Sequence, residues 1–176
     1  MLAYVMDASD RIVEIDGPWD EFAVANGAPA LTRERVLGTP ILNHVSGLEL
    51  RELTRMLLAR VRRGAEVALE FRCDSPSERR YLRMNLSAQP DGRVLCATTL
   101  LRAEPRPLQH LLDTGTSRSR DMLVICSWCK KVRLPNRGWV EVEEAIETLA
   151  LLQEPELPEM THSICDTCRA GLRSAA

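Results

Sequence analysis

The chain has 176 residues, of which 45% are hydrophobic and 27% charged, and its formal net charge is −2. This length suffices for one ordinary domain and a small second one, and the composition excludes a disordered chain. The nearly balanced charge gives no general attraction to nucleic acid or to an anionic membrane surface. The apolar stretch at residues 1–6 ends at Asp7, too early for a signal peptide or a membrane span. We therefore expect a cytoplasmic protein, in which cysteines stay reduced.

The first part of the chain combines short extended runs with helical segments. Residues 2–6 and 11–15 are β-rich runs on either side of a polar turn, which predicts a hairpin. Pro18 then stands in the first turn of a short predicted helix. Glycine and proline interrupt residues 28–47, where we expect short helical turns. The longest helix is predicted over residues 48–63, because leucine and valine recur there at spacings of three and four.

Three strand-like runs follow, at residues 67–73, 81–86 and 94–101. The resulting order of elements predicts an α+β fold, with one antiparallel sheet and its helices on one face. This order, together with the Asp-x-x-x-Arg-Ile sequence of the opening hairpin, resembles a PAS domain over residues 1–105. The resemblance implies a sensor and dimerisation module whose sheet can enclose a small ligand. It leaves that ligand unknown.

Three side chains of this part are candidate ligand or redox groups. His44 precedes the long helix and is a candidate haem ligand, with a capping or surface role as the simpler interpretation. Cys73 and Cys96 lie on strands that we expect to be neighbours in the sheet. They are candidates for a redox pair, with burial in the core as the simpler interpretation.

Residues 106–120 form a predicted linker, polar and mobile in its second half. The remaining residues, 121–176, begin with a strand that leads into a cysteine turn, followed by a second strand, a turn and a third strand. A helix is predicted around residues 145–152, and Pro155 and Pro158 end it. A second cysteine pair then opens a last short helix.

Two CxxC pairs carry the strongest chemical signal in the sequence. They are Cys126 with Cys129 and Cys165 with Cys168. Four thiolates in two such turns are the ligand set of a closed structural zinc site, so we predict one Zn²⁺ per chain. Sulfur ligands also suit iron, and a thiol–disulfide pair is the remaining alternative.

The residues around these cysteines resemble a short C-terminal tail of bacterial signalling proteins, which follows PAS and receiver domains. The matching segments are Ile125-Cys126, Cys129-Lys130-Lys131, Gly138-Trp139 and His162-Ser163-Ile164-Cys165. The order of cysteine turn, hairpin and second cysteine turn at a helix start resembles the treble-clef arrangement of small zinc modules. Two residues separate His162 from the second pair. We favour His162 as a hydrogen-bond donor to a thiolate over the alternative that it replaces one cysteine as a metal ligand.

The sequence contains no phosphate-binding glycine loop, HExxH motif or credible nucleophile–base pair, so we expect no enzymatic activity. The two resemblances together imply a bacterial signal-transduction protein that couples a PAS-like sensing or interaction module to a structural zinc domain. They also imply self-association through the PAS-like part and a signalling protein partner. The alternatives are a zinc-thiolate redox sensor and an iron- or haem-binding sensor. Acidic residues outnumber basic ones in residues 121–176, which argues against nucleic-acid binding there.

Overall fold

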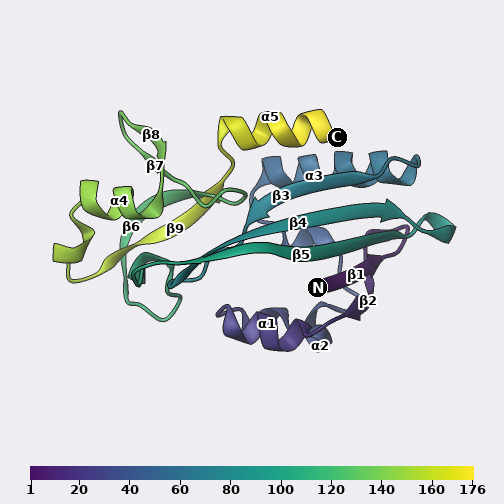
Figure 1. Ribbon diagram of the computed structural model, residues 1–176, viewed down its shortest axis with the longest axis horizontal. Coiled ribbons are helices and arrows are strands. Elements are labelled where there is room, and N and C mark those ends of the chain that lie inside the picture. Colours follow the sequence, from purple (N-terminus) through teal and green to yellow (C-terminus); the bar gives the residue numbers. More distant parts are fainter.

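Five antiparallel strands form the larger of two sheets, in the order β2-β1-β5-β4-β3 (Figure 1). The strands are β1 Leu2–Met6, β2 Ile12–Asp16, β3 Val67–Arg72, β4 Glu78–Ala88 and β5 Val94–Pro105. The structure is a computed structural model that describes residues 1–176. It confirms the opening hairpin and the three later strands, and it extends β4 and β5 beyond their predicted ends.

Apolar and polar side chains alternate along these strands and give the sheet one buried face. On β4, Leu82 and Leu86 are each 5% exposed, whereas Arg83 and Asn85 are exposed. Successive side chains of a strand point to opposite faces, so this pattern places the leucines toward the helices and the polar residues toward solvent.

Helices that lie between β2 and β3 in the sequence cover the buried face of this sheet. They are α1 Trp19–Ala25, α2 Arg33–Val36 and α3 Leu48–Arg62, with 3₁₀ turns at Pro29–Leu31 and Ile41–His44. The long helix α3 directs Leu57 and Val61 into a hydrophobic core that also contains Met6 of β1 and Leu86 of β4. The predicted α+β class, a PAS-like antiparallel sheet with helices on one face, is therefore confirmed. No helix of the chain is long and apolar enough to span a membrane.

The C-terminal residues build a second sheet, with strand order β8-β7-β6-β9. The strands of this sheet are β6 Arg118–Cys126, β7 Val132–Leu134, β8 Gly138–Val140 and β9 Leu157–Ser163. Two helices belong to the same part of the chain, α4 Val142–Thr148 and α5 Asp166–Ala175. A cysteine turn follows β6, β7 and β8 form an antiparallel hairpin, and the second cysteine pair opens α5. This order agrees with the treble-clef-like arrangement predicted from the sequence. We call residues 121–176 the cysteine module.

The sequence predicts no strand between α4 and the second cysteine pair, yet β9 forms there and pairs with β6 in parallel. Pro158 lies within β9 without disrupting the sheet, because β9 is an edge strand and one of its sides needs no backbone partner. Parallel pairing joins segments that are distant in sequence, so neither segment by itself indicates the other.

The predicted linker, residues 106–120, packs against the cysteine module at Leu111 and Arg118, and the mobility predicted for its second half stays a prediction. Leu111, in a 3₁₀ turn at His110–Leu112, is 0% exposed and belongs to the hydrophobic core of the cysteine module. The guanidinium of Arg118 donates to the backbone carbonyls of Leu111, Asp113 and Pro158, which holds the polar segment against β9. The division of the chain at residues 105 and 121 stays a prediction.

The two parts of the chain meet along α3 and α5, which lie side by side at the top of Figure 1. Arg169 of α5 forms an ion pair with Glu49 of α3. Leu172 of α5 is 1% exposed and packs in the same core as Leu57 of α3. The cysteine cage and α5 therefore pack in one core with the larger sheet, while the rest of the cysteine module has a second core.

Candidate metal centre and apolar cavity

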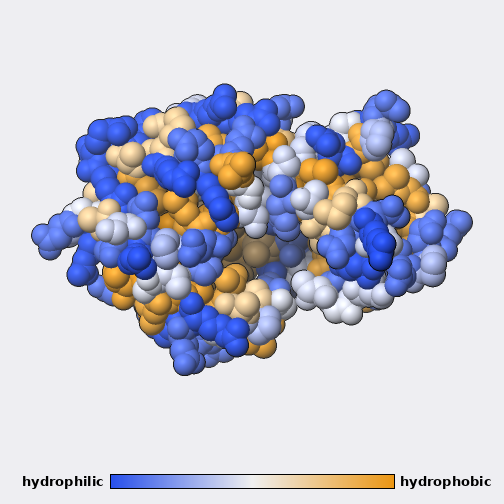
Figure 2. Space-filling view, turned by 180° about the vertical axis from the view of Figure 1, so that it is seen from behind, coloured by the Kyte–Doolittle hydropathy of each residue, from blue (hydrophilic) through white to orange (hydrophobic).

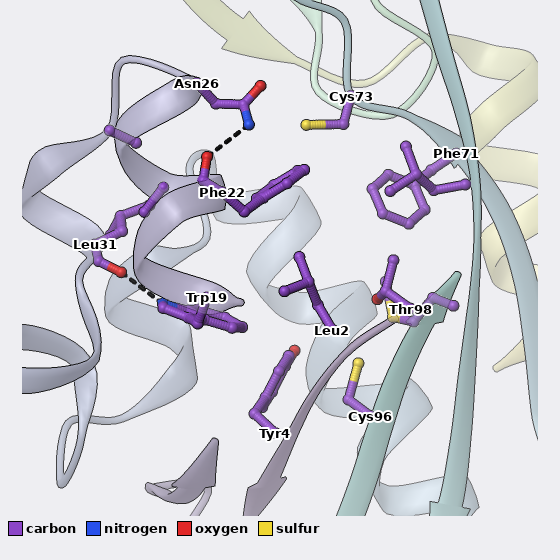
Figure 3. Close-up of a pocket in the computed structure, with 14 residues that line it drawn as sticks. Leu2, Tyr4, Trp19, Phe22, Asn26, Leu31, Phe71, Cys73, Cys96 and Thr98 are labelled. Atoms are coloured by element: carbon purple, nitrogen blue, oxygen red, sulfur yellow. Dashed lines mark hydrogen bonds between the residues drawn. The ribbon is translucent and has the colours of Figure 1, made fainter. Parts of the chain in front are cut away.

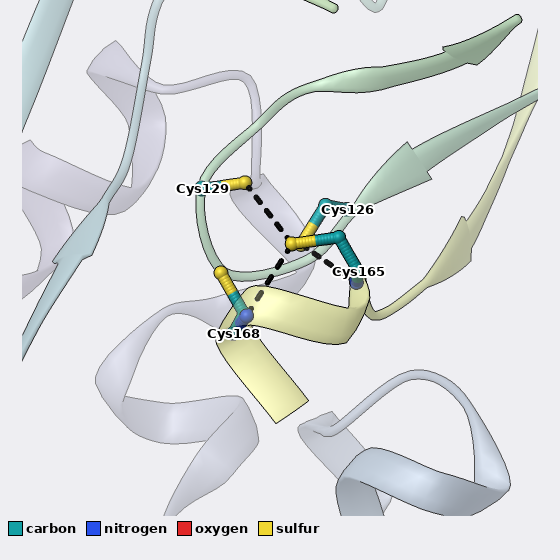
Figure 4. A group of neighbouring side chains, drawn as sticks. All are labelled: Cys126, Cys129, Cys165 and Cys168. Carbon is teal, nitrogen blue, oxygen red and sulfur yellow. Dashed lines mark hydrogen bonds between the residues drawn. The ribbon is translucent and has the colours of Figure 1, made fainter. Parts of the chain in front are cut away.

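The four paired cysteines converge where the end of β6, the turn before β7 and the start of α5 meet (Figure 4). Their sulfur atoms all lie within 4.8 Å of one another. The Sγ atoms of Cys129 and Cys165 are 3.8 Å apart. Zinc–sulfur bonds of about 2.3 Å at tetrahedral angles place neighbouring sulfurs about 3.8 Å apart. The spacing and the donor set therefore fit a tetrahedral zinc cage.

Backbone geometry explains why these cysteines face one another. Lys130 adopts a left-handed conformation, with φ of 63°, and its N–H donates to the carbonyl of Cys126 at 3.0 Å, which closes the first turn. In the second turn, the N–H of Cys165 donates to Cys126 Sγ and the N–H of Cys168 donates to Cys165 Sγ, both at 3.4 Å. Amide donors of this kind favour the thiolate form that metal binding requires.

The thiols influence one another's ionisation. Hydrogen bonds from Cys129 and Cys168 hold the pKa of Cys126 well below its ordinary value. The same hydrogen bond with Cys126 raises the pKa of Cys129 to about 11, and hydrogen bonding to Cys126 likewise raises the pKa of Cys168. One ionised sulfur thus opposes ionisation of its neighbours, and a bound cation is what allows all four to be thiolates together.

The cage has a buried side and an accessible side. Cys126 and Cys165 are 0% and 4% exposed, whereas Cys129 and Cys168 are partly exposed. His162 lies on β9, where it pairs with Ile125 of β6, and its side chain is exposed. The group of side chains that could hold a metal ion consists of the four cysteines and does not include His162. A role for His162 as a donor to a thiolate, or as an alternative ligand, stays a prediction.

Trp128, inside the first CxxC turn, joins the cysteine module to β3. Its indole Nε1 donates to the carbonyl of Glu70 at 2.7 Å, and its own carbonyl accepts from the N–H of Arg72 at 2.8 Å. Its ring lies 5.5 Å from the ring of Phe71. The sequence does not indicate this junction, because a tryptophan within a cysteine turn can equally well cover the module's own core.

Six charged residues reinforce the same junction. They are Arg72, Asp74, Arg79, Arg106, Glu141 and Glu143, which we call the junction ion cluster. Asp74, whose side chain is 1% exposed, binds both Arg72 and Arg106. Glu141 and Glu143, at the start of α4, accept from Arg72 and Arg79 respectively, at 2.7 Å each. No local sequence pattern identifies these residues, because charged residues such as arginine and glutamate usually indicate solvent-exposed positions.

An apolar cavity of about 370 Å³ lies between α1 and the buried face of the larger sheet (Figure 3). Its walls comprise 14 residues, 12 of them hydrophobic, and none is charged. Trp19 and Phe22 of α1 form one wall, and Tyr4 of β1 lies opposite them (Figure 3). The molecular surface seen from behind is also hollowed between its two parts, with hydrophobic residues in the hollow (Figure 2). The PAS-like part therefore has room for a small molecule.

The candidate groups of the PAS-like part do not form one site. Cys73 follows β3 and Cys96 lies on β5, with β4 between them, so the expectation that their strands are neighbours is wrong. Both thiols are free, and both line the apolar cavity from different positions (Figure 3). His44 is not among the residues of this cavity, and its Nε2 lies 2.7 Å from Thr39 Oγ1.

Cys96 is expected to resist alkylation in the folded protein. It is 1% exposed, and burial raises the pKa of its thiol to about 11. Because the thiolate is the reactive form, iodoacetamide at about pH 8 should label Cys96 at least about tenfold more slowly than Cys73, which is partly exposed. The stability that the neutral Cys96 thiol contributes is fully present below its ordinary pKa of 9.0 and is lost as pH rises through about 11.

Peptide mapping by mass spectrometry measures both labelling rates, and protein unfolded in guanidinium is the control in which both cysteines react. Equal labelling of Cys73 and Cys96 in the folded protein would contradict the assigned burial.

The strand order and helix placement define an α+β protein with a PAS-like sheet, joined to a four-cysteine module. No family model matches the chain, and no curated protein matches it. Among solved structures it is similar to the PAS-B domain of Cycle from Drosophila melanogaster, determined with bound ethylene glycol. The identity is 14%, the alignment covers 57% of this chain and 100% of that chain, and the TM-score is 0.39.

Proposed function

We propose that this chain is a bacterial signal-transduction protein, in which a PAS-like sensing or protein-interaction part acts together with a structural four-cysteine zinc domain. One observation carries the proposal: the two parts share a hydrophobic core. Cys126, Cys165 and Leu172 pack in the same group of buried residues as Met6 and Leu57. Because such cores are densely packed, a rearrangement in one part displaces atoms of the other.

Zinc is the proposed resident metal, with one ion per chain held by the four cysteine sulfurs. The approach of all four sulfurs within 4.8 Å supports a closed site. Bound in this way, Zn²⁺ supplies a rigid cross-link between the two cysteine turns and offers no open coordination position to a substrate. This supports a non-enzymatic role. The CxxC-Lys-Lys and His-x-x-Cys sequences around the site support the likeness to bacterial signalling tails.

Protein purified without added metal is expected to contain one zinc ion per chain and to show no visible absorbance. Inductively coupled plasma mass spectrometry measures the metal, and an ultraviolet–visible spectrum detects chromophores. The variant Cys73→Ser, altered outside the cage, should keep its zinc. Iron, or a haem or flavin band, would overturn the zinc assignment in favour of an iron- or haem-binding sensor.

A zinc-thiolate redox sensor is the second candidate function, and the partial exposure of Cys129 and Cys168 favours it. Hydrogen peroxide can oxidise two thiolates to a disulfide, with the peroxide reduced to water, and the cage then loses the ligands it needs to hold zinc. Zinc release by mild peroxide that is reversed by a reductant would support this function. Unchanged zinc content would leave the structural role.

We also propose a cytoplasmic location, a signalling protein partner and self-association through the PAS-like part. Leu100 and Leu101 of β5 are 54% and 46% exposed, which supports an apolar contact surface on this strand. Multi-angle light scattering at micromolar concentration should then report the mass of a dimer, and a monomer would contradict the self-association.

A further inference from the structure

The walls of the apolar cavity restrict the kind of molecule it can hold. Asn26 and Thr98 are its only lining residues outside the hydrophobic set. The side-chain amide of Asn26 already donates to the carbonyl of Phe22 at 2.6 Å, and its oxygen accepts from the guanidinium of Arg80. A charged ligand would lose its hydration without gaining an ion pair, which is strongly unfavourable. The lining therefore suits an uncharged, largely apolar molecule.

One wall of the cavity is also part of the junction with the cysteine module. This wall is the segment Phe71–Asp74, at the end of β3. Phe71 and Cys73 line the cavity, whereas Arg72 and Asp74, which alternate with them, belong to the junction ion cluster. Extended backbone directs successive side chains to opposite sides, so this segment contacts the cavity on one side and the junction on the other.

Contacts from both sides of this segment reach Trp128, which belongs to the metal cage's first turn. The ring of Phe71 is 5.5 Å from that of Trp128, with an angle of 44° between the ring planes. The N–H of Arg72 donates to the carbonyl of Trp128 at 2.8 Å. Trp128 lies between Cys126 and Cys129 in the first cysteine turn. Phe71 therefore lies in the cavity wall and also contacts the turn that supplies two of the four sulfurs.

We propose that the cavity binds a small, uncharged, apolar molecule, and that the segment Phe71–Asp74 transmits its occupancy to the cysteine module. The inference rests on the proposed sensing function and adds the class of ligand and the route of transmission. A molecule in the cavity restricts the motion of the Phe71 ring, which in turn holds Trp128 and the first cysteine turn in place. The occupied cavity thus favours the docked state of the turn over looser ones.

Two fluorescent probes that differ by a single charged group test the class of ligand. N-phenyl-1-naphthylamine is uncharged, and 8-anilino-1-naphthalenesulfonate is the same molecule with an added sulfonate. The uncharged probe should bind the full-length, zinc-containing protein at least about tenfold more tightly. Thr98→Phe, which adds a ring to the cavity, should abolish that binding. Equal affinities, or binding that survives Thr98→Phe, would overturn the assigned ligand class.

Hydrogen exchange measured by mass spectrometry tests the transmission. The uncharged probe should slow exchange in peptides covering residues 126–131 by about threefold or more, because it stabilises the docked turn. Phe71→Leu keeps an apolar wall but removes the ring contact with Trp128, so it should retain probe binding and lose this response. Leu31→Met, a change on the opposite wall of the cavity, should retain both (Figure 3).

Probe binding without slower exchange at residues 126–131, or an unchanged response in Phe71→Leu, would overturn the transmission route. Such a result would leave zinc binding and the shared core unaffected. Failure of the transmission proposal is therefore distinguishable from failure of the proposed function.

Discussion

Replacement of Cys126 and Cys129 together by serine is expected to remove the metal and to destabilise the whole chain, beyond the cysteine module. Structural zinc contributes about 10–16 kcal/mol in small zinc-dependent peptides, so residues 121–176 should unfold without it. The larger sheet should persist with weaker packing, because Cys126 and Leu172 belong to its core. A loss of about 3 kcal/mol from that core would lower the thermal midpoint by about 10 °C.

Zinc analysis, circular-dichroism melting curves and limited proteolysis measure the three parts of this prediction. Zinc should fall from one per chain to about zero, cleavage should concentrate after residue 121, and the midpoint of the remaining sheet should decrease. Cys73→Ser, a cysteine-to-serine change in the cavity wall and outside the cage, should retain zinc and resist cleavage. A double variant that keeps a folded cysteine module would refute the structural role of the metal.

Asp74→Asn is expected to lower the free energy of unfolding by about 3 kcal/mol, because it leaves two buried arginines without their shared counter-ion. The side chains of Asp74, Arg106 and Arg72 are only 1%, 4% and 8% exposed, so water cannot replace the lost charge. The junction between the larger sheet and α4 should loosen at the same time, since Arg72 also binds Glu141.

Urea unfolding monitored by tryptophan fluorescence measures this change. Glu14→Gln provides the matched control, since it removes a carboxylate from an exposed pair with Arg93 whose side chains are 61% and 46% exposed. That variant should change stability by less than about 0.5 kcal/mol. A cost for Asp74→Asn as small as that of Glu14→Gln would show that the junction ion cluster contributes little to stability.

Elements defined by local pattern were predictable from the sequence. The opening hairpin, the helix α3 and the strands of the larger sheet follow from periodicity and from glycine or proline at their ends. The four cysteines were predictable as one group, because CxxC is itself a local turn that presents two sulfurs to the same point.

Long-range contacts were not predictable in this way. Strand β9 exists because β6 offers a parallel edge, and Leu111 is buried because the cysteine module closes over it. Cys73 and Cys96 face one cavity although β4 separates their strands, which depends on how α1 covers the sheet. Each case joins residues far apart in the chain, and a single sequence contains no record of which distant partner a segment meets.

Propensity and spacing within a few residues specify the fold class, the order of the elements and the set of four cysteines, so these were predictable without the structure. Three features could be established only from the three-dimensional structure: part of the cysteine module shares a core with the PAS-like sheet, Trp128 docks on β3, and Asp74 is buried between two arginines. These features arise from packing and desolvation, which depend on the complete three-dimensional arrangement of the chain.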